Sequence, residues 1–253
     1  MRIFPMSLAS QYRKQFAWRD WDRALSACPI FPGQHVLDLG CGPGDLSREL
    51  SLRGAKVSGI DSNPDLLEIA QTSCSKECTF FNQNLSSVQM NPNSFDGLWC
   101  SFTAAYFTGF ERIFSNWLGF LKKDAWVCVV DMDDLLGHEP LPPKIQEQIH
   151  QFYQHSLQSQ NYDFKVGSKL QSILENAGFY TNSITLEDQE LSFTGPASEE
   201  VLQAWSSRLD RMNGLKAFLK RDFLLFKNEF LECLSHKDHR SRCRVICCVG
   251  RKS

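Results

Sequence analysis

The sequence of 253 residues predicts an α/β fold that is built on a mostly parallel sheet. Residues 36–39 form a short apolar run, typical of a buried strand, that ends abruptly at a glycine-rich turn. Further runs of this kind then alternate with segments of helical periodicity, and glycine, asparagine and proline residues separate them. Because strands that alternate with helices are joined by right-handed crossovers, we expect most of the strands to be parallel.

The glycine turn lies between the first expected strand and the first helix of the sheet. Residues 36–47 read VLDLGCGPGDLS, with Gly40, Gly42 and Gly44 at alternate positions. Glycines here allow left-handed backbone conformations and leave room for a ligand that any Cβ would exclude. The first N–H groups of the following helix face the same space. We expect Asp38, within the strand, to help fix this turn.

The remaining elements are assigned from periodicity and from their start and stop residues. Asn63 and Pro64 form a helix start, and Gly54 and Gly178 end two helices. Residues 8–28 mix aromatic and charged side chains, which predicts an amphipathic helix or a helix pair whose rings pack on the core or line a pocket. The other strands are expected at residues 56–60, 79–82, 95–101, 126–131, 183–193 and 242–250, and the later helices at 111–121, 144–158, 168–177, 199–212 and 215–234.

Composition and charge limit the classes of function. The chain has 27 basic and 29 acidic residues, a formal net charge of −2, so double-stranded nucleic acid is not an expected partner. No apolar run approaches the roughly 20 residues of a membrane span, and the first residues lack the long apolar segment of a secretory signal. We therefore expect a cytoplasmic protein of one domain, residues 1–253, with no membrane partner.

The ten cysteines predict a reducing compartment and no metal site. Most of them lie in or beside apolar runs, where cysteine acts as a small apolar residue. His236, His239, Cys243 and Cys247 have spacings that zinc tolerates, but residues 243–249 are expected to form a strand and no CxxC pair accompanies them.

The spacing of the glycines and Asp61 points to a nucleoside that carries no phosphate. A phosphate-binding P-loop needs a Lys-Ser/Thr pair where this chain has Asp45, and the dinucleotide motif places its third glycine one position after Gly44. The carboxylate of Asp45 would also stand at the helix N-terminus where a pyrophosphate binds. Asp61, at the end of the second strand, is placed to accept both hydroxyls of a ribose.

Four stretches together resemble the class I S-adenosylmethionine-dependent methyltransferases. They read VLDLGCGPG, VSGIDSNPDLL, FFNQNLSSV and NSFDGLW, and the resemblance covers about residues 35–131. It implies a Rossmann-like sheet of seven strands in the order 3-2-1-4-5-7-6, with strand 7 antiparallel, helices on both faces and a helical lid. The lid would comprise residues 1–30 and an insertion, residues 195–238, between the last two strands.

The same resemblance implies S-adenosyl-L-methionine as the cofactor and assigns the residues around it. Asn84 stands where the family often has Asp, and its amide oxygen can accept the adenine amino group as a carboxylate would. The residues expected at the cofactor are Gly40, Cys41 and Gly42 at the methionine part, Asp61 at the ribose, Ser62 at the adenine, Asn84 with the following Leu85, and Cys100 and Ser101 closing the methionine side.

The acceptor of the methyl group is less constrained. The fourth strand runs into SFTAAYF and lacks the Asn/Asp-Pro-Pro-aromatic sequence of enzymes that methylate planar amino groups. A small-molecule methyltransferase is thus expected, in which His138 is a candidate general base and Asp131 and Asp133 are placed to hold a polar acceptor. The candidates for the acceptor pocket are Tyr12, Trp18, Tyr106, Phe107, Tyr153, Arg208 and Arg211.

Three functions stay open on the sequence alone. The first is methyl transfer to oxygen or nitrogen of a metabolite, and the second is methylation of a protein or RNA. The third is binding of S-adenosylmethionine without catalysis, as in a sensor. Acceptor identity and oligomeric state have no signal in the sequence.

Overall fold

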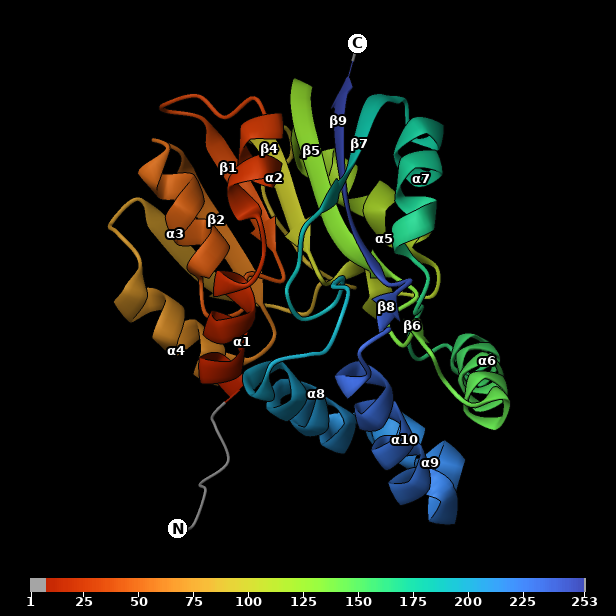
Figure 1. Cartoon of the computed structure of the whole chain (residues 1–253). Helices are drawn as coiled ribbons and strands as arrows, with labels where there is room; N and C mark the ends of the chain where they lie inside the picture. Colours follow the sequence, from red (N-terminus) through yellow and green to blue (C-terminus); the bar gives the residue numbers. More distant parts are fainter. Residues whose placement is uncertain (1–7, 253) are drawn as a thin grey trace.

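The computed structural model describes residues 8–252, so residues 1–7 of the expected N-terminal segment lie outside the described part. Within that part, seven strands form a central sheet in the order β3-β2-β1-β4-β5-β9-β7 (Figure 1). Neighbouring strands are parallel from β3 to β5, whereas β9 runs antiparallel to both β5 and β7. The strands are β1 (His35–Leu39), β2 (Lys56–Asp61), β3 (Cys78–Asn82), β4 (Phe95–Ser101), β5 (Leu121–Asp133), β7 (Phe179–Leu186) and β9 (Arg244–Lys252). Counted along these seven strands, the order is 3-2-1-4-5-7-6, and the predicted Rossmann-like α/β sheet is confirmed.

Strand β1 occupies the middle of the sheet, between β2 and β4. Val36, Leu37 and Leu39 are fully buried, because helices cover this strand on both faces and leave neither face to solvent. The chain leaves the sheet at Gly40, so the glycine turn emerges at the carboxyl end of the strand.

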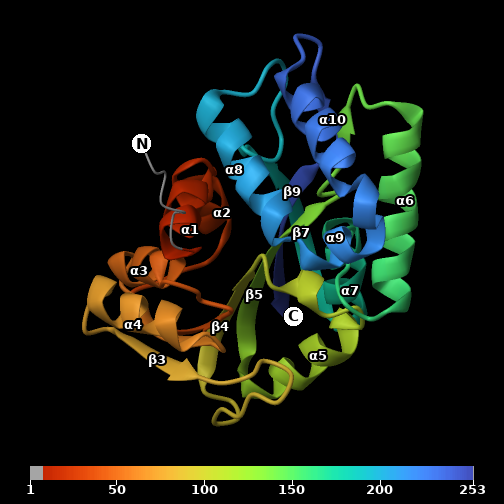
Figure 2. The same cartoon turned by 90° about the horizontal axis from the view of Figure 1, so that it is seen from below.

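Two helical layers cover the faces of the sheet (Figure 2). Helices α2 (Trp21–Ala27), α3 (Asp45–Leu52) and α4 (Pro64–Ser73) lie on one face, and α5 (Phe110–Trp117) and α7 (Leu170–Asn176) lie on the other. The predicted start of α4 is found: the side chain of Asn63 accepts the backbone N–H groups of Asp65 and Leu66. Gly178 follows α7 with a positive φ of 85°, as a residue that ends a helix in the left-handed conformation.

A third group of helices lies beyond the carboxyl ends of the parallel strands (Figure 1). It comprises α1 (Leu8–Ala17), α6 (Pro143–Gln158), α8 (Glu199–Arg211), α9 (Asn213–Leu219) and α10 (Phe223–Ser235). Helices α8 to α10 come between β7 and β9 in the chain, and a short antiparallel pair, β6 (His138–Glu139) with β8 (Arg240–Ser241), lies beside them. We call α1, α6, α8 and α9 the lid helices.

The predicted strand at residues 183–193 is wrong in its second half. β7 ends at Leu186, and residues 187–193 leave the sheet as a loop that reaches the lid helices. The side chain of Asp188 accepts the backbone N–H groups of Glu190 and Leu191, each at 2.8 Å. This local turn competes with the sheet for the backbone donors and ends the strand.

Two helix boundaries also differ from the expectation. The expected helix at 111–121 ends at Trp117 and is followed by a 3-10 turn, and β5 already begins at Leu121. The expected helix at 215–234 is two helices, separated at Lys220, which has a φ of 52°. Among residues 8–252, no helix combines the length and the apolar character needed to cross a bilayer.

Candidate functional site

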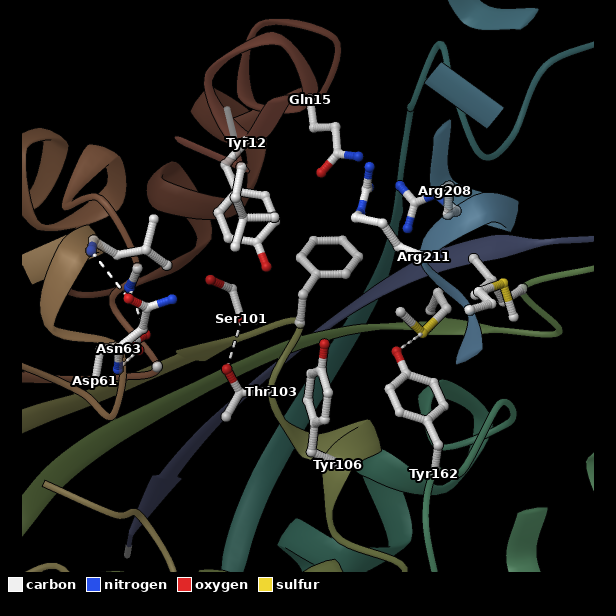
Figure 3. A pocket seen from close by; sticks show the side chains of 18 of the residues that line it. Tyr12, Gln15, Asp61, Asn63, Ser101, Thr103, Tyr106, Tyr162, Arg208 and Arg211 are labelled. Atoms are coloured by element: carbon white, nitrogen blue, oxygen red, sulfur yellow. Dashed lines mark hydrogen bonds between the residues drawn. The ribbon is translucent and has the colours of Figure 1, made fainter. Parts of the chain in front are cut away.

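A cavity of about 990 Å³ lies between the carboxyl ends of β1, β2 and β4 and the lid helices (Figure 3). In open α/β sheets this edge is where ligands bind. One part, the glycine-loop half, is lined by residues 38–46, 61–66 and 84–85. The other part, the lid half, is lined by the lid helices and by the segments after β4, β5 and α6.

The glycine turn is packed so closely that side chains are excluded from it. Gly40 has a φ of 79°, and a Cβ there would collide with the hydroxyl oxygen of Thr103. Gly42 also has a positive φ, of 52°, and the ring of Tyr12 lies 3.8 Å from where its Cβ would stand. Tyr12 on α1 therefore covers the glycine turn directly.

Asp61 joins the glycine turn to the start of α4. Its Oδ2 accepts the N–H of Gly42 and its Oδ1 accepts the N–H of Asn63, both at 2.9 Å. These bonds orient the carboxylate at the cavity wall, and each oxygen retains a lone pair for a further donor. A ribose diol supplies such donors.

Asp38 presents a second carboxylate to this half of the cavity. Its Oδ2 accepts the hydroxyl of Ser47 at 2.6 Å, which ties β1 to α3 as expected. Its Oδ1 is buried and has no hydrogen-bond partner within residues 8–252. Burial raises the pKa of Asp38 to about 7. An ammonium group that entered the cavity would satisfy this oxygen and favour the ionised carboxylate.

The composition of the glycine-loop half fits S-adenosylmethionine. Asp38, Asp45 and Asp61 line it, a set that disfavours a phosphate and favours the hydroxyls and the ammonium of an aminoacyl nucleoside. Burial raises the pKa of Asp45, whereas Arg13 and Arg48 act against this rise. The glycine turn provides backbone against which a thioether chain can lie.

The predicted adenine residues line the cavity, but one of them is already engaged. Ser62, Asn84 and Leu85 all contribute to the wall. The amide oxygen of Asn84 accepts the N–H and the hydroxyl of Ser86, at 2.9 and 2.8 Å. Because both lone pairs of this oxygen are used, the expected acceptance of an adenine amino group by Asn84 is wrong for this conformation.

Of the two residues expected to close the methionine side, Ser101 lines the cavity and Cys100 does not. Cys100, the last residue but one of β4, is fully buried, and its side chain points to the face of the sheet opposite to that of Ser101 because successive side chains of a strand alternate. Cys41 lies on the wall together with Gly40 and Gly42.

Five of the seven predicted acceptor-pocket residues line the cavity: Tyr12, Tyr106, Phe107, Arg208 and Arg211. Tyr106 meets Tyr162 edge to face, with ring centroids 5.0 Å apart. Burial raises the pKa of Tyr106 to about 12 and also raises the pKa of Tyr12, so both phenols are neutral near pH 7. They offer hydrogen bonds and ring faces to a ligand, and neither serves as a base.

The structure places His138 outside the cavity, and its candidacy as a general base is wrong. Its Nδ1 lies 3.0 Å from Nε2 of His239, and its ring packs edge to face against Trp205 and Phe230. Burial lowers the pKa of His138 to about 3, and the neighbouring His239 lowers it further. A histidine this deep in the core holds elements together and has no path to an acceptor.

Tyr153 and Trp18 also lie away from the cavity wall. Tyr153 is buried, and its hydroxyl accepts the N–H of Leu136 at 2.7 Å. This bond joins α6 to the segment that follows β5. Trp18 packs at the end of α1, and its carbonyl oxygen accepts the N–H of Gln189. Both rings were expected in the acceptor pocket, and both pack against protein instead.

Asp131 and Asp133, at the end of β5, do not line the cavity either. Asp131 is fully buried and accepts the N–H of Ala105 at 3.1 Å, which anchors the segment after β4. Burial raises the pKa of Asp131 to about 7. Asp133 forms an ion pair with Arg244 at 3.0 Å, so both carboxylates position strands.

Several cavity residues carried no prediction. Phe102 and Thr103 follow β4 directly, and the rule that ligands bind at the carboxyl ends of strands would have found them. Phe102 takes a left-handed φ of 51° that turns the chain into the cavity wall. Gln15, His155 and Tyr162 come from helices or loops of the lid, where no local pattern indicates them.

The loop that follows β7 holds the lid helices against the cavity. Asp188 is buried and pairs with Arg19, whose guanidinium lies 3.9 Å from the ring centroid of Phe102. Glu190 is fully buried and accepts Arg208 Nη2 on both oxygens at 2.8 Å, and the amide of Gln15 at 3.3 Å. One acidic loop thereby fixes α1 and α8 together.

The fold and the glycine-loop half define the class of this protein. A seven-stranded sheet in this order, with a glycine turn after the first strand and an aspartate after the second, is the architecture of the class I S-adenosylmethionine-dependent methyltransferases. Residues 36–124 match the family model described as "Methyltransferase domain". The predicted resemblance to this class is confirmed by the family match over residues 36–124 and by the strand order of the sheet.

Comparisons with individual proteins agree with the class. The ubiquinone biosynthesis O-methyltransferase of Xanthomonas campestris is 36% identical over 80 residues, which are 30% of this chain and 34% of that protein. The chain thus spans about a third of the length of the curated relatives it matches.

Two solved structures share the fold at low sequence identity. Phosphoethanolamine N-methyltransferase 2 of Haemonchus contortus, in complex with S-adenosyl-L-methionine, is 20% identical with a TM-score of 0.56, covering 92% of this chain and 52% of that one. An S-adenosylmethionine-dependent methyltransferase of Mesorhizobium loti is 15% identical with a TM-score of 0.56, covering 92% and 97% of the two chains.

Proposed function

We propose that this protein is an S-adenosylmethionine-dependent methyltransferase that acts on oxygen or nitrogen of a small molecule. The observation that carries the proposal is the cavity of about 990 Å³, which runs from Asp61 and the glycine turn to the lid helices without a break. A donor in the glycine-loop half and an acceptor in the lid half would share this one space. S-adenosylmethionine supplies, when bound, an electrophilic methyl group on a sulfonium.

The chain's own residues would bind, orient and enclose the two reactants. Asp61 would hold the ribose, Asp38 the ammonium of the methionine part, and the backbone of Gly40 and Gly42 the chain between them. The ring of Tyr12 covers the glycine turn at Gly42. Alignment of the acceptor behind the methyl group and exclusion of water are the main contributions that an in-line transfer needs.

An aromatic acceptor agrees with the wall of the lid half. Apolar and aromatic side chains make up most of that wall, among them Phe102, Phe152 and Phe164. Tyr106 and Tyr162 add neutral hydroxyls at its edge, since burial raises both pKa values. The likeness to the ubiquinone biosynthesis enzyme over 80 residues supports O-methylation of a small molecule as the finer form of the proposal.

A protein or RNA acceptor is the second candidate, and a binder without catalysis is the third. A macromolecular acceptor would need an open basic groove. Here α1 and α8 are joined over the cavity through Gln15, Glu190 and Arg208, and the net charge is −2. These features favour an enclosed small molecule.

The test is methyl transfer from S-adenosylmethionine with a tritiated methyl group. The purified protein is incubated with a cell extract that has been divided into a fraction of small metabolites, a protein fraction and an RNA fraction. We expect label in the metabolite fraction, and loss of that label with Asp61→Ala. Label confined to the protein or RNA fraction would overturn the small-molecule acceptor, and cofactor binding without label in any fraction would overturn catalysis.

A further inference from the structure

One guanidinium in the lid half has no hydrogen-bonded or ion-pair partner within the described residues 8–252. Arg211, in the last turn of α8, lines the cavity and makes no hydrogen bond or ion pair with any residue from 8 to 252. Figure 3 shows its side chain on the same side of the cavity as Gln15 and Arg208. Its guanidinium therefore belongs to the wall of the lid half, where an acceptor would bind.

The other two arginines on the cavity wall differ from Arg211 because each is paired with a buried carboxylate. Arg19 is held by Asp188, and Arg208 is held by Glu190. Glu190 is engaged by Arg208 and Gln15, since its Oε1 accepts both and its Oε2 accepts Arg208. Among residues 8–252, Arg211 has no such carboxylate bonded to it.

Arg211 is exposed to solvent while it lines the cavity, so its charge is accessible to a ligand. Partial desolvation lowers the pKa of Arg211 and the neighbouring positive charge of Arg208 lowers it further, whereas Tyr12 and Glu190 act against this lowering. The carboxylates that line the cavity, Asp38, Asp45 and Asp61, all belong to the glycine-loop half. A planar guanidinium with free donors is the side chain that best matches a carboxylate or a phosphate.

The side chains that line the lid half with Arg211 indicate the polarity of the rest of such a ligand. Phe152, Met212 and Leu215 lie on the lid side of the cavity, together with Leu135 and Phe164. A molecule that placed an acidic group on Arg211 would therefore rest its body on apolar side chains. Only the end that reaches the glycine-loop half would meet the methyl donor.

We propose that Arg211 binds an oxyanion of the methyl acceptor, so that the acceptor is a small apolar or aromatic molecule with a carboxylate or phosphate group. This inference rests on the proposed function of the same cavity. It assigns to Arg211 a substrate-specificity role, and to Arg208 the structural role of holding α8 on Glu190.

The test compares ligands that share one apolar body. Binding of 2-naphthoate, 2-naphthyl phosphate and the neutral 2-naphthamide is measured by calorimetry, with S-adenosylhomocysteine filling the glycine-loop half. We expect at least one anion to bind roughly ten-fold or more tightly than the amide, since charge-assisted bonds are the strong ones. The two anions separate a carboxylate acceptor from a phosphate acceptor.

Variants then assign the preference to one side chain. Arg211→Gln is expected to bind all three naphthyl compounds alike, and Arg211→Lys to retain part of the preference. Arg112→Gln, on the exposed surface of α5 and away from the cavity, is the matched control and should behave as the unchanged protein. The affinity for S-adenosylhomocysteine, measured in every variant, reports that the fold and the glycine-loop half are intact.

The outcomes separate this inference from the proposed function. Equal binding of the amide and both anions by the unchanged protein would overturn the oxyanion site while leaving methyl transfer untouched. A preference that persists in Arg211→Gln would also overturn it. If Arg211→Gln weakens binding of S-adenosylhomocysteine and not of the anions, Arg211 holds the cofactor's own carboxylate. Failure of the unchanged protein to bind S-adenosylhomocysteine would instead count against the proposed function.

Discussion

The carboxylate of Asp61 accepts the backbone N–H of Gly42 at 2.9 Å, so one side chain both shapes the glycine turn and faces the cavity. Removing it would free the turn and delete the expected ribose acceptor. We expect Asp61→Ala to weaken binding of S-adenosylhomocysteine roughly 10- to 100-fold, because hydrogen bonds to charged groups are worth about 1.5–3 kcal/mol. Calorimetric titration measures this directly.

Asp61→Asn is the graded version of this experiment. An amide retains one acceptor oxygen, and we expect a smaller loss than with alanine. Asp124→Asn, on the exposed start of β5, serves as the control and should leave the affinity unchanged. Unaltered binding by Asp61→Ala would remove Asp61 from the cofactor site.

The substitution Gly40→Ala tests how closely the glycine turn is packed against its neighbours. Alanine at this position would adopt a positive φ and would place its Cβ against the side chain of Thr103. The left-handed conformation costs a residue with a Cβ about 1–2 kcal/mol, and the steric conflict adds to it. We expect Gly40→Ala to lower the free energy of unfolding by roughly 2–4 kcal/mol, measured by urea denaturation.

Gly33→Ala separates the two contributions to that loss. Gly33 has a comparable φ of 86°, but nothing lies within 4 Å of its would-be Cβ. Its substitution should cost only the backbone term, about 1 kcal/mol. Equal losses in the free energy of unfolding at the two glycines would show that the side chain of Thr103 can move aside without an energetic cost.

We expect the Glu190–Arg208 pair to contribute strongly to the stability of the folded protein, because it holds lid helix α8. Glu190→Gln would leave the guanidinium of Arg208, which is only 18% exposed, without a counter-charge. Breaking a buried pair in this way typically costs about 3–5 kcal/mol, and we expect a loss towards the lower end because Arg208 retains some access to solvent. Thermal and urea unfolding provide the measurement.

Another ion pair across α1 and α8 provides the matched comparison. Lys14 and Glu200 lie 3.9 Å apart with side chains 40% and 68% exposed. Glu200→Gln should change stability by less than about 1 kcal/mol, because exposed pairs contribute little. The double substitution Glu190→Gln with Arg208→Met should recover part of the loss, and no recovery would mean that hydrogen bonds of Glu190 other than those to Arg208 dominate.

The buried histidine pair predicts a loss of stability in mild acid. Nδ1 of His239 lies 3.0 Å from the carbonyl oxygen of Gly195 and must donate to it, so Nε2 of His239 accepts a hydrogen bond from the Nδ1–H of His138. In the folded chain the pKa of His138 is lowered to about 3 by burial. The unfolded chain, with a histidine pKa of about 6.5, therefore takes up the proton first.

It follows that the stability which neutral His138 contributes is present above pH 6.5 and is lost as the pH falls from there towards 3. We expect the free energy of unfolding to fall by about 1 kcal/mol from pH 7 to 5.5 through this group alone. His138→Phe keeps a ring against Trp205 and should flatten the dependence on pH. His150→Gln, on the exposed face of α6, should not alter the slope, and an unchanged slope in His138→Phe would refute the assignment.

The predictions agree best with the structure where the role of a residue depends on its immediate neighbours in the chain. Val36 and Leu37 need burial on both faces, Asn63 caps the helix that follows it, and Gly40 permits a turn that no side chain allows. Each of these effects acts within a few residues of the chain. For that reason the strands and the order of motifs up to β4 were predictable without coordinates.

The predictions that were wrong concern side chains whose partners lie far away in the sequence. His138 and Tyr153 lie on segments at the correct edge of the sheet, yet one packs with His239 and the other with Leu136. The loop that Asp188 begins is also joined to the N-terminal segment, because Asp188 pairs with Arg19. A pattern along the sequence holds no information about such pairs.

The glycine turn and Asp61 were enough to predict the class of protein, because they act through backbone conformation and through the ends of adjacent strands. Which arginine of the lid half is free of a bonded carboxylate within residues 8–252 became clear from the three-dimensional structure alone. Arg208 and Arg211 lie one turn apart on α8 and are equivalent by pattern, but Glu190 comes from another part of the chain and neutralises Arg208 alone. Its carboxylate accepts hydrogen bonds from Arg208 and Gln15, whereas no hydrogen bond joins it to Arg211 within residues 8–252.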